Sequence, residues 1–337
     1  MKHLYLTFLA ALVLSLNFSA QVFSPELSTQ NQPVQNQSPG IVGLPETIDT
    51  FVPPPAGFQY GAQRVATINV NYTGFSAQAQ NAFQYAVDIW ASILTSPIEI
   101  EIDAEWTVLE GNTLGSAGAN GHYPTVDALP GFYFPSALAD KLNSSDQDPF
   151  ESDVICRFNS ESNWYLGTDG NPGDLQYDFV SVVLHELGHG LGFAGLSGYD
   201  INDEVEAFPG IYDFYVEDNN FIDILDFTDG SSALENALTG DNLFWNGTNG
   251  VAAAGGVRPK LYVPSPYEPG SSYSHLDENT YPAGSGNSLM TPFIGNGEAV
   301  HNPGPIAIGM MEDMGWTVGE AGGCEDLEYQ LVLDLDC

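Results

Sequence analysis

The sequence predicts an α+β protein, and three features of the chain support this fold class. A strand, a helix and a second strand are expected between residues 65 and 106, and a further helix is expected at 177–191. The segments between and after them are punctuated by glycine and proline. With 337 residues, of which 43% are hydrophobic, the chain is long enough for one or two domains with a sizeable core.

The first three elements follow from the spacing of apolar residues. Residues 65–72 alternate between apolar and polar side chains, as a strand does. Residues 76–94 form an amphipathic helix, and residues 98–106 alternate strictly, with one apolar and one acidic face. A strand, helix and strand in this order predict a parallel pair joined by a right-handed crossover.

The middle of the chain has weaker patterns. Residues 107–150 contain a short helix near 135–142, and residues 152–158 are a further strand candidate. Residues 169–174 form an ordinary Asx-type turn or, as the alternative, a calcium site.

Two helices are expected after this turn. Residues 177–191 form a helix that buries Phe179, Val182 and Leu184, and residues 305–314 form a last helix closed by Gly315 and Trp316. Residues 196–274, between them, are expected to be irregular.

Both ends of the chain differ from its centre. Residues 1–20 are typical of a secretory signal peptide, with Lys2 before an apolar run at 4–16 that is too short to span a membrane. Residues 21–62 are rich in Gln, Ser, Pro and Asn, which predicts a low-complexity linker or a short pro-segment without regular structure. Residues 319–337 form an acidic tail that could begin a further module. We therefore expect a secreted protein.

The charge balance excludes two function classes. Six Lys and Arg residues stand against 44 Asp and Glu, which gives a formal net charge of −38. Such a chain can neither neutralise a run of nucleic-acid phosphates nor bind an anionic membrane surface. Most of these carboxylates are expected to form a solvated surface, which also favours divalent cations.

The three cysteines are too few for a cysteine-rich scaffold or a four-thiolate zinc site. Cys156 lies among apolar residues, so we expect a small buried side chain rather than the alternative, a reactive thiol. Cys324 and Cys337 are close in sequence and could form a disulfide, although the pairing among the three stays open.

The predicted helix at 177–191 contains His185-Glu186-Leu187-Gly188-His189. Residues four apart lie on one face of a helix, so both imidazoles can point at one zinc ion. Glu186 is then placed to take a proton from a water molecule and to pass it to a leaving amine. This spacing predicts a zinc-dependent hydrolase with Glu186 as the general base.

The third ligand stays open on spacing alone. In the common metzincin pattern it lies three residues after Gly192, but that position is Gly195, which has no side chain to ligate. A more distant residue must serve, and the candidates are the histidines and glutamates of the remaining chain: His122, His275, His301, Glu204 and Glu206.

Further motifs carry a resemblance to a known family. The stretch from His185 to Phe193, a long insertion, then Ser274-His275 and Ser288-Leu289-Met290-Thr291-Pro292, resembles the leishmanolysin-like branch of the metzincin metallopeptidases. The resemblance implies that His185, His189 and His275 bind zinc and that Glu186 is the catalytic base. It also implies that Met290 lies in a turn beneath the metal, where it packs rather than ligates.

The family also implies an architecture and an activity. A metallopeptidase domain at 63–318 would have an N-terminal subdomain at 63–192, with a mixed twisted sheet and the active-site helix. A C-terminal subdomain with the insert at 193–318 would lie below the zinc cleft. We expect a monomeric, secreted zinc endopeptidase that acts on polypeptides, with calcium as a further candidate ion. The alternative is a non-catalytic adhesion protein with a structural zinc site and a calcium-binding acidic surface.

The sequence departs from the family pattern at two places. No cysteine precedes Cys156, so latency through a pro-segment thiol is not expected. Pro292 stands where some metzincins have a tyrosine that supports the oxyanion.

Overall fold

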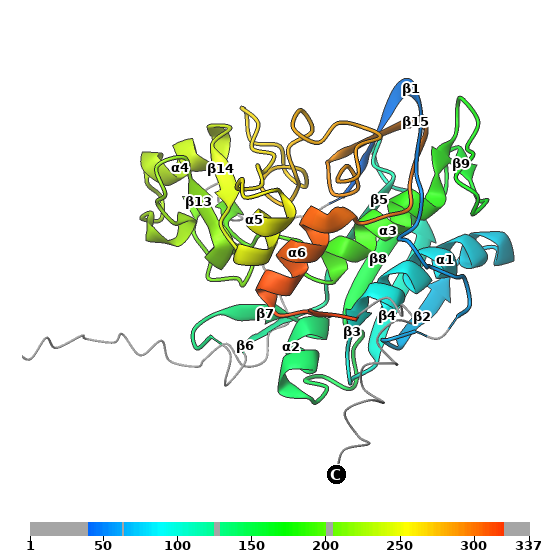
Figure 1. Cartoon of the computed structure of the whole chain (residues 1–337), viewed down its shortest axis with the longest axis horizontal. Helices are drawn as coiled ribbons and strands as arrows, with labels where there is room; N and C mark the ends of the chain where they lie inside the picture. Colours follow the sequence, from blue (N-terminus) through cyan, green and yellow to red (C-terminus); the bar gives the residue numbers. More distant parts are fainter. Residues whose placement is uncertain (1–39, 63, 125–128, 200–204, 320–337) are drawn as a thin grey trace, which may run out of the picture. The chain divides into compact units, whose positions relative to one another are not determined.

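The computed structural model describes residues 40–62, 64–124, 129–199 and 205–319, which form an α+β fold with several small sheets and six α-helices (Figure 1). The predicted fold class is confirmed. The expected signal peptide at 1–20, residues 320–337 of the acidic tail with Cys324 and Cys337, and Glu204 lie outside the described residues.

A four-stranded sheet has the order β2-β4-β8-β5. Its first three strands, β2 (Ile68–Thr73), β4 (Ile100–Thr107) and β8 (Val154–Asn159), are parallel, and β5 (Gly115–Ala119) pairs antiparallel with β8 at the edge. In β4 the even positions from 100 to 104 are buried, as the alternation predicted. The parallel pair β2 and β4 is confirmed, whereas β5 was not predicted.

Helix α1 (Ala77–Ile93) begins where the Ser76 side chain accepts the Ala79 N–H, so a hydroxyl satisfies one of the free amides of the first turn. Its apolar face packs on α3 (Phe179–Gly190). Trp90 ties the two helices together, because its indole N–H donates to the Leu184 carbonyl at 2.9 Å. Both helices were predicted within two residues of their observed ends.

A long parallel pair joins the two ends of the described chain: β1 (Val42–Val52) lies beside β15 (Phe293–Val300) (Figure 1). The prediction that residues 21–62 lack regular structure is therefore wrong for residues 42–52. The strand depends on hydrogen bonds to a distant partner, so the local pattern of small and polar residues carries no sign of it.

The segment expected to be irregular at 196–274 contains regular elements. Strands β13 (Val216–Asp218) and β14 (Leu243–Trp245) pair antiparallel, and α4 (Ser232–Thr239) and α5 (Thr248–Ala253) lie near them in the chain. The expectation is wrong here because these elements are short, so each depends on packing rather than on its own periodicity.

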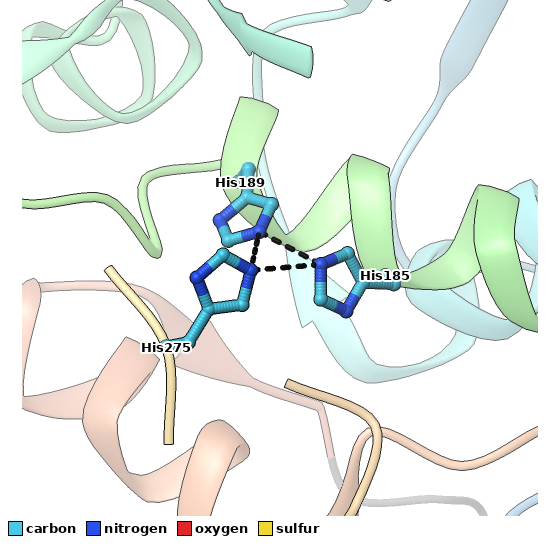
Figure 2. A group of neighbouring side chains, drawn as sticks. All are labelled: His185, His189 and His275. Carbon is cyan, nitrogen blue, oxygen red and sulfur yellow. Dashed lines mark hydrogen bonds between the residues drawn. The ribbon is translucent and has the colours of Figure 1, made fainter. Parts of the chain in front are cut away.

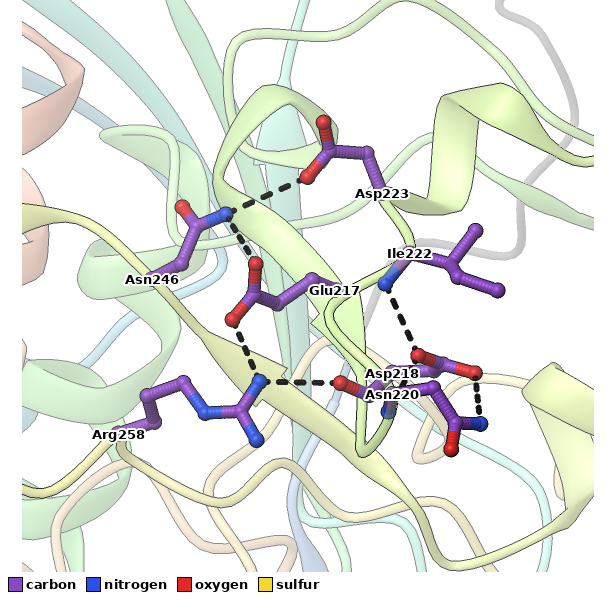
Figure 3. Close-up of polar contacts among 7 residues, drawn as sticks. All are labelled: Glu217, Asp218, Asn220, Ile222, Asp223, Asn246 and Arg258. Carbon is purple, nitrogen blue, oxygen red and sulfur yellow. Dashed lines mark hydrogen bonds and ion pairs between the residues drawn. The ribbon is translucent and has the colours of Figure 1, made fainter.

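Polar contacts stabilise the β13–β14 region (Figure 3). Arg258 pairs with the Glu217 carboxylate and donates to the Asp218 carbonyl at 3.0 Å. Asn246 also donates to Glu217, at 3.1 Å. The Arg258 guanidinium lies 4.1 Å from the centre of the Phe221 ring, so the same side chain adds a cation–π contact.

The remaining elements are short. They are α2 (Ser136–Asn143), α6 (Gly304–Met314), β3 (Leu94–Thr95), β6 (His122–Pro124), β7 (Tyr133–Pro135), β9 (Trp164–Tyr165), β10 (Tyr177–Asp178), β11 (Gly198–Tyr199), β12 (Val205–Glu206), β16 (Thr317–Val318) and the 3-10 turns η1 (Asp213–Tyr215) and η2 (Ile224–Asp226). The predicted helices near 135–142 and at 305–314 are confirmed, and α6 ends at Gly315 with φ 119°. Among the described helices, none has the length and apolar character needed to cross a bilayer.

Candidate metal centre

Helix α3 carries the first two histidines and is held at both ends. Its N-cap is Asp178, which accepts the Ser181 N–H at 2.8 Å. At the other end, the indole N–H of Trp316 donates to the Leu191 carbonyl at 2.9 Å. A side chain at Gly190 would place its Cβ 2.3 Å from Val154, so glycine lets α3 lie directly on the sheet. The position of the helix is therefore fixed by buried contacts.

Three histidines converge beside this helix. The Nε2 atom of His189 lies 2.9 Å from that of His185 and 3.1 Å from that of His275, and His275 and His185 are 3.2 Å apart (Figure 2). All three side chains are buried. They form a group of ligand atoms close enough to hold one metal ion.

The hydrogen bond at Nδ1 of each ring determines whether its Nε2 atom carries a proton or a free lone pair. Nδ1 of His185 lies 2.6 Å from the Leu289 carbonyl, and Nδ1 of His189 lies 2.6 Å from that of Phe193. Nδ1 of His275 lies 2.7 Å from the Ser271 carbonyl. A carbonyl only accepts, so each Nδ1 carries the proton and each neutral ring points an Nε2 lone pair inward. Three lone pairs cannot satisfy one another, whereas a cation would satisfy all of them.

Burial makes the neutral rings the favoured form. Desolvation lowers the pKa of His185 to about 4 and lowers the pKa of His189 and His275 well below the ordinary value. Metal ligation requires neutral imidazole, so the burial and the tautomers favour the same state.

His275 lies on a loop that packs against the C-terminal end of α3. The Leu276 N–H donates to the Met290 carbonyl at 2.8 Å, and the Gly195 N–H donates to the Ser274 hydroxyl at 3.1 Å. A Cβ at Gly195 would lie 2.0 Å from the Tyr273 ring. The space beside Gly195 is thus occupied by the ring of Tyr273, which precedes His275 in the loop by two residues.

Met290 lies under the helix between the two histidines. A Cβ at Gly188 would lie 2.8 Å from the Met290 sulfur, so the thioether occupies the space that the glycine leaves. The carbonyl of its neighbour Leu289 accepts the hydrogen bond from Nδ1 of His185, and Met290 itself is fully buried. Met290 is therefore packed against α3 at Gly188, between His185 and His189 in the sequence.

Glu186 lies on α3 directly after His185 and is fully buried. Its Oε1 atom accepts the Ile41 N–H at 2.9 Å, and its Oε2 atom has no hydrogen-bond partner among the described residues. Burial raises the pKa of this carboxyl well above the ordinary value, and the main-chain N–H groups of Ile41 and Ala117 oppose the rise. The contact with Ile41 was not predicted, because a main-chain N–H leaves no mark in the sequence.

The other ligand candidates lie elsewhere. His301 is buried, with its Nε2 atom 2.8 Å from the carboxylate of Asp178, so it supports the cap of α3. His122 lies in β6, and Glu206 is exposed in β12. The structure does not bring these residues to the three histidines.

Cys156 is a buried thiol in the centre of the sheet. It is fully buried, and burial raises its pKa well above the ordinary value, with the carboxyl of Glu186 adding to the rise. Its sulfur lies 3.6 Å from the Asp103 carbonyl. The prediction of a small buried side chain is confirmed.

Comparisons with known proteins cover part of the site. Residues 122–249 match the SPBPB7E8-like family. A protein of Schizosaccharomyces pombe, named Uncharacterized protein PB7E8.01, is 36% identical over 72 residues, which cover 20% of this chain and 12% of the yeast protein. The family match includes His185, Glu186 and His189 and ends before His275.

Proposed function

We propose that this chain is a zinc-dependent endopeptidase. The observation that supports it most directly is the convergence of three Nε2 lone pairs beside a buried glutamate with one free carboxylate oxygen. Three protein nitrogens leave a fourth position of a tetrahedral metal for a ligand from outside, which is typical of catalytic zinc sites. Structural zinc sites instead have four protein ligands.

The donor set fits zinc. Bonds of about 2.1 Å in a tetrahedral site separate two ligand nitrogens by about 3.4 Å, and the three separations in this chain fall within about half an ångström of that value. Bound there, zinc would supply a Lewis acid that polarises a peptide carbonyl and lowers the pKa of water.

The protein's own groups have separate roles in this proposal. Glu186 takes a proton from the attacking water and returns it to the leaving nitrogen. Burial, which raises the pKa of this carboxyl, suits the second step, because a general acid must hold the proton until the leaving nitrogen takes it. The Leu289, Phe193 and Ser271 carbonyls keep the three rings in the ligating tautomer.

The proposal includes the metzincin-like division into subdomains at 63–192 and 193–318. It is supported by the position of Met290 under α3 and by the antiparallel edge strand β5, which lies against the same helix. The apolar run at residues 4–16 supports export, and a monomer acting on polypeptides completes the proposal.

Cleavage of an unfolded protein tests the proposal. We expect the purified, zinc-loaded protein to cleave it, and a zinc chelator to abolish cleavage. Glu186→Ala should lower the rate by at least about 100-fold while one zinc per chain stays bound. Glu235→Ala, which removes an exposed carboxylate on α4, is the matched control and should leave both unchanged.

The second candidate is a non-catalytic protein with a structural metal site, and the burial of all three histidines favours it. It predicts one tightly bound zinc with no cleavage of any unfolded substrate. That result would contradict the endopeptidase proposal.

A further inference from the structure

A short segment, residues 40–43, crosses the candidate site in an extended conformation. On one side, the Leu114 N–H donates to the Ile41 carbonyl at 3.0 Å and the Gly43 N–H donates to the Asn112 carbonyl at 3.0 Å. On the other side, the Gly40 N–H donates to the Gly270 carbonyl at 3.2 Å and the Val42 N–H to the Pro292 carbonyl at 3.1 Å. The segment is therefore a strand held between two walls.

The two walls belong to the elements that build the site. Val42 pairs antiparallel with Thr113, two residues before β5, and pairs parallel with Phe293, three residues after Met290. Gly270 precedes Ser271, whose carbonyl holds His275. A polypeptide substrate bound by main-chain hydrogen bonds would have to use these same walls, because they flank Glu186 and the histidines.

Within this segment, the peptide bond between Gly40 and Ile41 faces the catalytic glutamate. The Ile41 N–H is the group that donates to Glu186 Oε1, at 2.9 Å. The nitrogen that would leave on hydrolysis is thus within reach of the carboxyl that would protonate it.

The two residues of this bond fit their surroundings closely. Ile41 is 3% exposed and forms one side of a small pocket, whose apolar lining includes Leu289, Ile294 and Val300. A Cβ on Gly40 would lie 2.5 Å from the Gly115 carbonyl, so a larger residue would displace the strand.

We infer that the Gly40–Ile41 peptide bond is a substrate of the chain's own site, and this inference depends on the proposed endopeptidase function. Water adds its oxygen to the Gly40 carbonyl carbon, and Glu186 accepts the proton. The carbon–nitrogen bond then breaks as Glu186 delivers the proton to the Ile41 nitrogen. Gly40 ends as a carboxylate and Ile41 as a free amine, so the step consumes only water.

The same contacts define the class of external substrate. The site takes an extended polypeptide with glycine before the cleaved bond and a branched aliphatic residue after it. Until residues 40–43 are displaced, they occupy the groove and keep other chains out.

Intact mass and N-terminal sequencing of the full chain, prepared without metal and then given zinc, test the inference. We expect a new N-terminus at Ile41, and no such product from Glu186→Gln. Ile41→Asp adds a carboxylate to a pocket that Glu298 already lines and should slow the cut at least about 100-fold, whereas Ile41→Val should stay within about tenfold. A cut that also appears in Glu186→Gln would overturn the inference, since it would come from another protease.

Failure of the inference and failure of the proposed function give different results. A zinc-loaded chain that cleaves an unfolded protein but leaves Gly40–Ile41 intact overturns the inference alone. A chain that binds zinc and cleaves neither overturns both.

Amide hydrogen exchange tests whether residues 40–43 lie in the candidate site, and it does not depend on catalytic activity. In the metal-free protein we expect the Ile41 amide to exchange slowly, because it is buried and bonded to Glu186. Ile41→Asp should speed exchange at residues 41–43, and Ile41→Val should not. An Ile41 amide that exchanges as fast as an unstructured peptide contradicts the proposed position.

Discussion

The hydrogen-bond partner of each ring nitrogen distinguishes a candidate metal ligand from a buried histidine with another role. His275 and His301 are both buried histidines, but His275 donates to a carbonyl and points Nε2 at two other rings, whereas His301 points Nε2 at Asp178. Burial alone therefore does not identify a ligand. The partner of each ring nitrogen does.

This difference predicts opposite effects of two substitutions. His275→Ala should lower zinc affinity by more than about 100-fold, because a ligand is lost outright. His301→Ala should leave zinc affinity unchanged but lower the free energy of unfolding by about 1–3 kcal/mol, because Asp178 loses a buried partner. Competition with a chromophoric chelator and denaturant unfolding measure the two quantities. The reverse pattern would contradict the ligand assignment.

Glu278 gives a prediction about pH. Burial raises its pKa to about 7, and the charge of Glu298 adds to the rise. In the unfolded chain a glutamate titrates near about 4.3, so the folded state binds this proton more tightly. The contribution to stability is therefore fully present below about pH 4 and is lost as the pH rises through 7, with a slope of at most about 1.4 kcal/mol per pH unit.

Glu278→Gln should flatten this fall, because the amide does not titrate. Denaturant unfolding at several pH values between 4 and 8 measures the slope. Glu235→Gln, at an exposed position on α4, is the control and should keep the wild-type slope. An unchanged slope in Glu278→Gln would show that another group causes the dependence.

The sequence revealed some residues of the site and not others, for physical reasons. His185, Glu186 and His189 follow from helical spacing, which is a local pattern. His275 followed only from the family resemblance, because its position depends on the path of a long insertion. Ile41 could not be found, since its contact uses the main chain and would be available to any residue but proline.

At the scale of elements, α3 and the Met290 turn depend on each other. The methionine side chain lies against Gly188, and the neighbouring Leu289 carbonyl holds His185. Met290→Ala should leave a cavity under the helix and lower the free energy of unfolding by about 2–5 kcal/mol. Met290→Leu conserves volume and should cost less than about 1.5 kcal/mol.

The same pair of variants tests whether packing supports the ligands. We expect Met290→Ala to weaken zinc binding by about 10–100-fold, as the loss of a supporting contact does. Zinc titrations of both variants measure this effect. If Met290→Ala unfolds more easily but binds zinc as tightly as Met290→Leu, the turn stabilises the fold without orienting His185.

Elements with their own periodicity were predicted, and elements that depend on a distant partner were not. Helix α1 and strand β4 bury regular sets of apolar side chains and could be identified locally. Strands β1 and β15 pair although they are far apart in the sequence. Strand β5 is rich in glycine and alanine. Such strands are stabilised by main-chain hydrogen bonds to neighbours, which a single sequence does not reveal.

At the scale of the whole molecule, charge is the dominant feature. Every Lys and Arg among the described residues has a polar partner: Arg64 with Asp88, Arg157 with Glu105, Arg258 with Glu217, Lys260 with Asp241, and Lys141 with the Gly315 carbonyl. The remaining carboxylates of a chain with net charge −38 have few cations left to balance them. Their mutual repulsion favours expanded states.

Added salt should therefore stabilise the fold. Raising the NaCl concentration from about 10 mM to about 150 mM shortens the Debye length from about 30 Å to about 8 Å and weakens this repulsion. The unfolding midpoint should rise, and KCl should give the same shift. CaCl2 that raises the midpoint further at equal ionic strength would indicate a specific calcium site, for which the turn at 169–174 is the candidate given as the alternative to an ordinary Asx-type turn. A midpoint that does not rise with salt would contradict the role of repulsion.

The candidate metal centre would also join parts of the chain that are far apart, since His275 lies 86 residues after His189. A ligand that binds only the folded state stabilises it by about 4 kcal/mol when its free concentration is about a thousand times Kd. We expect zinc to raise the unfolding midpoint, a chelator to reverse the rise, and His275→Ala to abolish both effects. Glu186→Ala should keep them, because the carboxylate is not a ligand in this proposal. A midpoint that responds to zinc equally in all three proteins would place the ion elsewhere, and loss of the response in Glu186→Ala would make this glutamate a ligand rather than a base.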